Sequence, residues 1–262
     1  MDDARRLGLL LKRWRAVRAK SQLALALDAG VSPRHLSFVE SGRSRPSREL
    51  LFTLADALNV PLRDRNLLLA AAGFAPIYAE SALSEEEMRG LEAALATILE
   101  HQEPYPAVVL DRQWNVVRAN RSAPKLFALF VDPATLPQPL NLLRTMLSPV
   151  MRPFIANWDV VSSTLARRVF REAVGGVPDP RALELLRDLT AGREDPPDPG
   201  GGAYAMPFHP VVFAKGDLRL SFFSMITTVG APLDITAQEL RIEGFFPTDQ
   251  ATEAFARRAL AP

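Results

Sequence analysis

The chain has 262 residues, of which 48% are hydrophobic and 23% are charged. These proportions are typical of folded globular proteins and exclude a fibrous or largely disordered chain. The absence of cysteine excludes disulfide bonds, thiolate metal sites and cysteine nucleophiles. The length favours two domains, each able to bury a core of its own.

The formal net charge of +1 conceals a difference between the two parts of the chain. Residues 1–75 contain thirteen Lys and Arg against seven Asp and Glu, a local net charge of +6, so the remainder is acidic. A basic module joined to an acidic one indicates a domain that binds a polyanion next to a domain with another task.

The first 75 residues predict five short helices. Apolar residues from Leu7 to Val17 recur at helical spacing, which defines the first helix. Ser21 is expected to cap the second helix and Gly30 to end it, and Ser32 is expected to cap the third, which ends at Gly42. Two further helices are expected over 50–58 and 64–72. Five short helices in about 70 residues predict a compact all-α domain over residues 1–75.

The rest of the chain predicts a connecting helix followed by an α+β domain over residues 104–262. The helix is expected over 76–103, because residues 84–87 form a capping box. The alternation of residue types then predicts strands and helices in mixed order. They are expected as strands at 107–110 and 115–118, a helix at 120–130, helical pieces within 140–192, a loop at 194–202, a hairpin of 211–214 and 218–228, a strand at 238–246 and a helix at 248–260.

The second and third helices, with the turn between them, have the arrangement of a helix-turn-helix, in which the later helix enters the DNA major groove. The sequence here resembles the XRE/Cro repressor family. The resemblance is carried by Ser21-Gln22-Leu23-Ala24, Gly30-Val31-Ser32, Leu36-Ser37, Val39-Glu40-Ser41-Gly42 and Arg45-Pro46-Ser47. It implies a transcriptional regulator that binds double-stranded DNA as a homodimer, with Glu40 paired to Arg15 inside the domain.

The residue types of this segment suit contacts with DNA. A glutamine at a helix start and arginines beyond the third helix suit phosphate contacts, whereas Arg34 suits a bidentate contact with guanine and Phe38 suits a thymine methyl group. The predicted DNA-binding residues are Gln22, Ser32, Arg34, His35, Ser37, Phe38, Arg43 and Arg45. The alternative is structural, since Ser21-Gln22 and Ser32-Pro33 would start a helix in any protein and Phe38 would fit a core.

Residues 104–130 resemble the opening of a PAS-type sensor domain, with two strands followed by a helix near an Asn. Together with the segment Ser32–Glu40, they resemble the MmyB-like regulators, which implies a PAS-like domain with a small apolar ligand such as a fatty acid. The candidate ligand-binding residues are Phe127, Phe130, Phe154, Trp158, Phe170, Phe213, Phe222 and Met225. Arg118, Arg121, Arg144 and Arg152 are candidates for a ligand carboxylate. An ordinary core would need the same apolar side chains.

Two other classes of protein compete with a ligand-sensing regulator: an enzyme and a regulator without a ligand. The only histidines are His35, His101 and His209, and no nucleotide-binding or nucleophile-elbow motif occurs, so we expect no catalytic residues, no metal and no cofactor other than a bound fatty acid. A regulator whose second domain only dimerises it remains the alternative. The first residues do not resemble a signal peptide and the longest apolar stretch is too short to span a bilayer, so we expect a cytoplasmic protein without a membrane partner.

Overall fold

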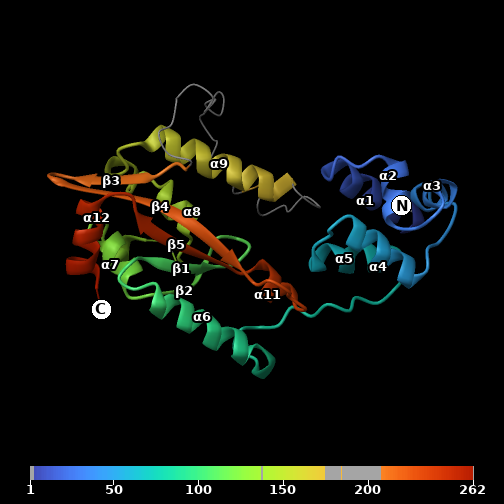
Figure 1. Ribbon diagram of the computed structural model, residues 1–262, viewed down its shortest axis with the longest axis horizontal. Helices are drawn as coiled ribbons and strands as arrows, with labels where there is room; N and C mark the ends of the chain where they lie inside the picture. Colours follow the sequence, from blue (N-terminus) through green and yellow to red (C-terminus); the bar gives the residue numbers. More distant parts are fainter. Residues whose placement is uncertain (1–2, 137, 175–183, 185–207, 262) are drawn as a thin grey trace. The chain divides into compact units, whose positions relative to one another are not determined.

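The computed structural model describes residues 3–136, 138–174, 184 and 208–261 (Figure 1). The chain divides into two compact units. The first comprises Met1–Glu80 together with Arg171–Leu183 and Pro232–Gln238, and the second comprises Ser81–Phe170, Glu184–Ala231 and Glu239–Pro262.

Five helices form the N-terminal part of the first unit, as predicted: α1 (Asp3–Val17), α2 (Gln22–Asp28), α3 (Pro33–Glu40), α4 (Arg48–Ala57) and α5 (Leu62–Ala71). Serine side chains cap three of them, since Ser21, Ser32 and Ser47 accept hydrogen bonds from backbone N–H groups three residues later, at 3.0, 3.1 and 3.2 Å. Each of these bonds satisfies a donor that the first helical turn leaves without a partner. The caps therefore fix where α2, α3 and α4 begin.

The core of the first unit brings α1 very close to α3. Trp14, Leu36 and Val39 are almost completely buried in one apolar cluster. At Gly8 an added Cβ would lie 2.2 Å from the carbonyl oxygen of Glu40, so only glycine fits there. Gly42, at the end of α3, has a φ of +75°, which an L side chain rarely adopts. These two glycines allow the backbones of α1 and α3 to pack against each other.

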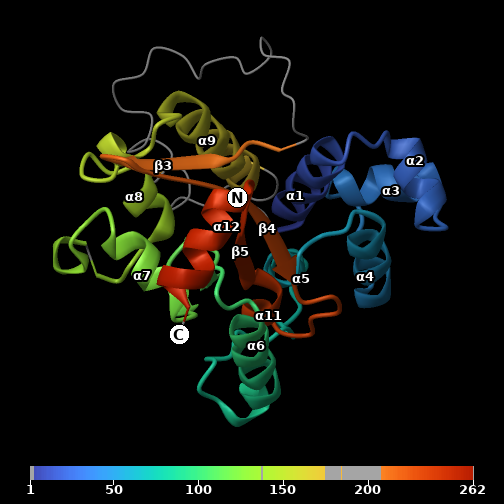
Figure 2. The ribbon, with the colours of Figure 1, turned by 60° about the vertical axis from the view of Figure 1, so that its left-hand side comes forward.

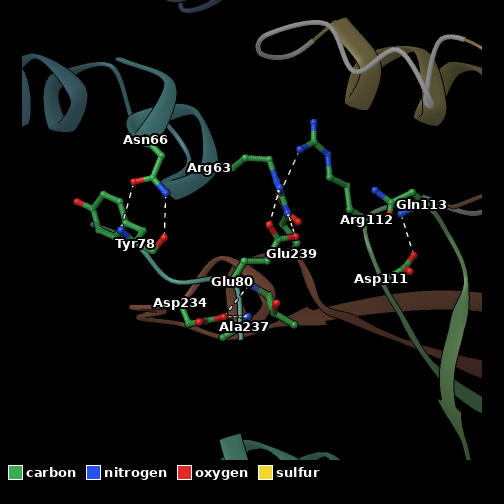
Figure 3. A network of polar contacts seen from close by, with 11 residues as sticks. Arg63, Asn66, Tyr78, Glu80, Asp111, Arg112, Gln113, Asp234, Ala237 and Glu239 are labelled. Atoms are coloured by element: carbon green, nitrogen blue, oxygen red, sulfur yellow. Dashed lines mark hydrogen bonds and ion pairs between the residues drawn. The ribbon is translucent and has the colours of Figure 1, made fainter. Parts of the chain in front are cut away.

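The helix predicted over 76–103 is wrong in its first part. Residues 76–85 contain no helix, and the helical structure begins with η1 (Glu86–Met88) and α6 (Arg89–His101). Side chains of α5 hold the non-helical segment: Asn66 Nδ2 donates to the Tyr78 carbonyl at 2.8 Å, Asn66 Oδ1 accepts from Ile77 N at 3.0 Å, and Arg63 pairs with Glu80 (Figure 3). These long-range bonds satisfy backbone groups that a helix would otherwise pair.

The second unit contains a five-stranded antiparallel sheet. Its strands are β1 (Ala107–Leu110), β2 (Val116–Ala119), β3 (Val211–Lys215), β4 (Leu218–Thr228) and β5 (Arg241–Pro247), in the order β2-β1-β5-β4-β3. The predicted hairpin and first two strands are confirmed. The last strand begins later than predicted because the short helix α11 (Ile235–Glu239) precedes it. Asp234 starts that helix by accepting hydrogen bonds from the backbone N–H groups of Thr236 and Ala237 (Figure 3).

Helices cover both faces of the sheet (Figures 1 and 2). On one face Leu95 and Leu99 of α6 pack on Ala107, Val109 and Ile242. A larger core on the other face takes residues from α7 (Ser122–Ala128), α8 (Leu142–Met146), α9 (Trp158–Val174) and the π-helical turn η4 (Ala256–Leu260), which follows α12 (Gln250–Phe255). Short η2 (Pro133–Thr135) and η3 (Arg152–Phe154) lie between the helices. The predicted α+β fold is confirmed, while the loop at 194–202 lies outside the described residues.

Candidate DNA-binding and ligand-binding sites

Helix α3 separates its residues into a buried and an exposed face. Leu36, Val39 and Glu40 are 1%, 0% and 3% exposed, whereas Arg34 and His35 are exposed and Ser37 and Phe38 are half-buried. The guanidinium carbon of Arg34 lies 5.4 Å from the centre of the Phe38 ring, one helical turn later. The predicted base-reading residues are therefore available to a partner, and Phe38 supports Arg34 rather than filling the core.

A buried carboxylate fixes α3 to α1 and α2. Glu40 accepts hydrogen bonds from Arg15 Nε at 2.9 Å and from Gln22 Nε2 at 2.8 Å. The hydrogen bond to Glu40 is the main cause that raises the pKa of the Arg15 guanidinium above its usual value. The pairing that the family resemblance implied is present. The side-chain amide of Gln22 has a second N–H group that does not bond to Glu40. The phosphate contact predicted for Gln22 is therefore compatible with the structure.

The loop after α3 carries the predicted phosphate-binding arginines. Arg43 and Arg45 are exposed, and the backbone N–H groups of Arg43 and Ser44 both donate to the carbonyl of Phe38, at 2.8 and 3.2 Å. The loop is thus folded back on the end of α3. Arg48, the exposed first residue of α4, was not among the predicted residues, although three arginines within residues 43–48 were a signal for it. The segment presents cations for a polyanion.

Most of the predicted ligand-binding residues lie in one aromatic cluster of the second unit. Phe127, Phe130, Phe213 and Phe222 are buried in its main core, and Phe154 and Trp158 pack against that core while half-buried. Phe130 stacks on Phe213 with 5.2 Å between ring centres. The structure therefore brings together six residues that are far apart in sequence.

Two of the predicted ligand-binding residues lie outside the aromatic cluster. Phe170 is 52% exposed near the end of α9, and Met225 is 58% exposed on β4. The four arginines considered for a carboxylate are also all exposed, and Arg118 is paired with Glu92. These six side chains lie at the surface of the described residues instead of in the aromatic core.

An arginine and tryptophan cluster in the second unit was not predicted from the sequence. The guanidinium groups of Arg168 and Arg241 lie 4.2 and 4.3 Å from the centre of the Trp114 ring. Arg168 also pairs at 3.0 Å with Glu243, which is 4% exposed. These residues come from β5, α9 and the turn after β1, so no local sequence pattern could have indicated the cluster.

The core of the second unit also buries a hydroxyl group without a partner. Thr145 on α8 is 2% exposed, and its Oγ1 has no hydrogen-bond partner among the described residues. Its helix neighbours Leu142, Leu143 and Met146 all belong to the main core. An unsatisfied buried hydroxyl costs about 1–3 kcal/mol, so a water molecule or a ligand oxygen that bonded to Thr145 would stabilise this position.

Neither a metal site nor a membrane span is found in the described part of the chain. No group of His, Asp and Glu side chains there is arranged to hold a metal ion. None of the described helices is long and apolar enough to cross a bilayer.

A helix-turn-helix with an exposed cationic recognition helix, followed by a separate α+β domain, defines a DNA-binding transcriptional regulator. Residues 11–64 match the helix-turn-helix family, and residues 91–259 match the family described as the MmyB-like transcription regulator ligand binding domain. The second match covers more than half of the chain. The chain therefore belongs to the MmyB-like transcription regulators, as its resemblance implied.

A solved structure also matches the chain. The crystal structure of the clp gene regulator ClgR from Corynebacterium glutamicum is 28% identical, over 39% of this chain and 95% of that chain, with a TM-score of 0.24. A score this low does not establish a shared arrangement of the two chains. Comparison with curated proteins gave no match.

Proposed function

We propose that this regulator works in the cytoplasm, binds DNA as a homodimer through α3, and responds to a small apolar, fatty-acid-like molecule held in its second domain. The observation that carries the DNA-binding part is the division of α3 into a buried face and an exposed face that contains Arg34 and His35. Nothing in the core requires a cation at that exposed position, whereas guanine offers two acceptors to an arginine in the major groove.

Dimerisation follows from the small footprint of one such domain. A single recognition helix contacts only a few base pairs, and regulators of this architecture read two half-sites about one helical turn apart. A symmetric dimer presents two recognition helices in this way. We expect the protein to be dimeric at micromolar concentration, and light scattering after gel filtration measures this directly.

Three observations support a ligand in the second domain. The domain belongs to a family described as ligand-binding, its core gathers six of the eight candidate ligand-binding side chains, and Thr145 places an unsatisfied hydroxyl beside that core. Apolar sites with a few polar groups are typical of small-molecule binding. A ligand changes DNA affinity only if it binds the DNA-competent and DNA-incompetent states differently, and typical coupling corresponds to about 5- to 150-fold.

Native mass spectrometry of the purified protein, beside a denatured sample, tests for a copurified lipid. Added dodecanoic or hexadecanoic acid should raise the melting temperature, because a ligand that binds only the folded state stabilises it. A protein that carries no lipid and shows no thermal response to either acid would contradict the sensing role.

The Thr145→Val variant tests whether the Thr145 hydroxyl contributes to ligand binding. Without ligand it should raise the free energy of unfolding by about 1 kcal/mol, since it removes a buried group with no partner. With added fatty acid the rise in melting temperature should be smaller than in the wild type. Thr97→Val, an exposed position on α6, is the matched control and should leave the ligand response unchanged.

The alternative is a second domain that only dimerises the protein. The close stacking of Phe130 on Phe213 favours it, because side chains packed this way serve a core without any ligand. A dimer that binds DNA, copurifies without lipid and is indifferent to fatty acids would establish this alternative. In that case Thr145→Val should only stabilise the protein.

A further inference from the structure

The outer edges of the sheet differ in how they are covered. The outer side of β2 is bridged by Asn115 to Asn141 and by the bond from Val116 N to the Leu140 carbonyl at 2.8 Å. The outer side of β3 is bridged by Ile155 to Phe213 and by the bond from Ala156 N to the Val212 carbonyl at 2.8 Å. Covering strand edges in this way prevents them from pairing with other chains.

The second half of β4 lacks such cover among the described residues. β4 spans Leu218–Thr228, but β3 pairs only with its first five residues and the register ends at Val211 opposite Phe222. Pro210 precedes that last pair, and proline has no N–H group to continue the ladder. On the other side, β5 pairs with β4 as far as Thr228. Within the described ranges, residues 223–228 therefore have a partner strand on one side only, and Phe208 stacks on Phe223 with 4.3 Å between ring centres.

The composition of this edge does not protect it. Residues 221–230 contain no charged residue and no proline, whereas β2 carries Arg118 and the paired half of β4 carries Arg219. Met225 and Ile226 are 58% and 47% exposed and point to opposite faces of the strand. An uncharged edge with exposed apolar side chains on both faces is a surface that another strand would complete.

We propose that residues 223–228 of β4 form the dimer contact by pairing antiparallel with the same segment of a second copy of this chain. This inference rests on the dimer of the proposed function and names its interface. A two-fold pairing uses the same edge of β4 in each copy and then closes, so it produces a dimer and no longer assembly. Because the segment is uncharged, placing it against itself brings no like charges together.

Single-cysteine variants test the contact directly, because the chain contains no cysteine of its own. Variants of the full chain with Ser224→Cys, Met225→Cys, Ile226→Cys or Thr227→Cys are oxidised and run on non-reducing gels. Directly opposite residues of an antiparallel pair have Cβ atoms about 4.5–5.5 Å apart, close enough for a disulfide at the centre of the pairing. We expect a covalent dimer from at least one of the four and none from Val117→Cys, an exposed position on β2.

A charge substitution provides the second test. Ile226→Lys places two like charges at the interface and should weaken dimerisation by about 100-fold, measured by light scattering at several concentrations. Val117→Lys is the control and should remain dimeric. Circular dichroism verifies that both variants fold. If Ile226→Lys does not fold, the cysteine variants alone test the contact.

The outcomes separate the two proposals. If the wild type and Ile226→Lys are both fully dimeric and no β4 cysteine forms a disulfide, the protein forms a dimer but β4 is not its interface. If the wild type is monomeric at micromolar concentration, the proposed dimeric function itself fails. Disulfides confined to β4, with a monomeric Ile226→Lys, would establish the contact.

Discussion

Helix α3 and the aromatic cluster of the second unit were both assigned a role from sequence, but the structure tests the two assignments unequally. On α3 the assigned residues Arg34 and His35 are exposed, which folding does not require. In the aromatic cluster Phe130 and Phe213 are buried, which folding requires with or without a ligand. The exposure of a predicted surface site therefore supports its proposed role, whereas the burial of a predicted interior site does not distinguish a ligand site from an ordinary core. Separating folding from function needs variants.

The largest expected effect concerns the interior. Phe213→Ala should lower the free energy of unfolding by about 3–5 kcal/mol, because it leaves a cavity where a fully buried ring stacks on Phe130. Phe170→Ala should cost far less, since that ring is half exposed. Urea denaturation measures both. Similar losses in the two variants would show that Phe170 is buried in solution and would restore it to the predicted site.

Two helical glycines provide the next test, since they differ only in their surroundings. Gly8→Ala should lower the free energy of unfolding by about 3 kcal/mol, because the added methyl group meets the backbone of α3. Gly90→Ala in α6 meets nothing within 4 Å and should raise stability by about 0.5–1 kcal/mol through helix propensity. Thermal unfolding distinguishes the signs. A neutral Gly8→Ala would mean that α3 can shift away from α1.

The exposed face of α3 is tested by DNA binding. Arg34→Ala should weaken binding to the selected operator by about 1–3 kcal/mol and relax base preference, whereas Arg45→Ala should weaken binding to all sequences alike. Fluorescence anisotropy on an operator selected from random DNA and on a scrambled duplex measures both, at several salt concentrations. Equal losses on the two duplexes for both variants would remove the distinction between base and phosphate contacts. Affinity that does not fall with salt would argue against phosphate contacts altogether.

The smallest expected effect concerns a helix cap. Ser32→Ala and Ser47→Ala each remove one capping hydrogen bond and should each cost about 1 kcal/mol of stability. If Ser32 also contacts DNA, its variant should bind the operator more weakly than Ser47→Ala does. Identical affinities for the two variants would leave Ser32 with a capping role alone.

The features that the sequence predicted well depend on neighbouring residues. Ser21 and Ser32 cap the helices that follow them, and the hairpin of β3 and β4 turns at Gly216, whose φ is +57°. Such signals act over a few residues, so a single sequence contains them. The candidate DNA-binding residues also lie close together in sequence, on α2, α3 and the loop that follows, and their contacts with DNA stay a prediction.

The features that were missed depend on distant residues. Residues 76–85 are not helical because Asn66 and Arg63 hold them from another helix, which overrides the local pattern. The stacking of Arg168 and Arg241 on Trp114 joins three separate segments. The apolar stripe of α6 illustrates the same limit, since its spacing does not reveal that Leu95 and Leu99 pack on strands from distant parts of the chain.

If Arg34 contacts a base as proposed, its position over the Phe38 ring affects the energetics of that contact. A free arginine side chain loses about 2 kcal/mol of rotamer entropy when it is immobilised. A guanidinium that already rests on an aromatic ring has fewer rotamers to lose, so more of its interaction energy remains as affinity. By this reasoning Phe38→Leu, which keeps an apolar side chain but removes the ring, would make binding less favourable in entropy while leaving every hydrogen bond to the base in place.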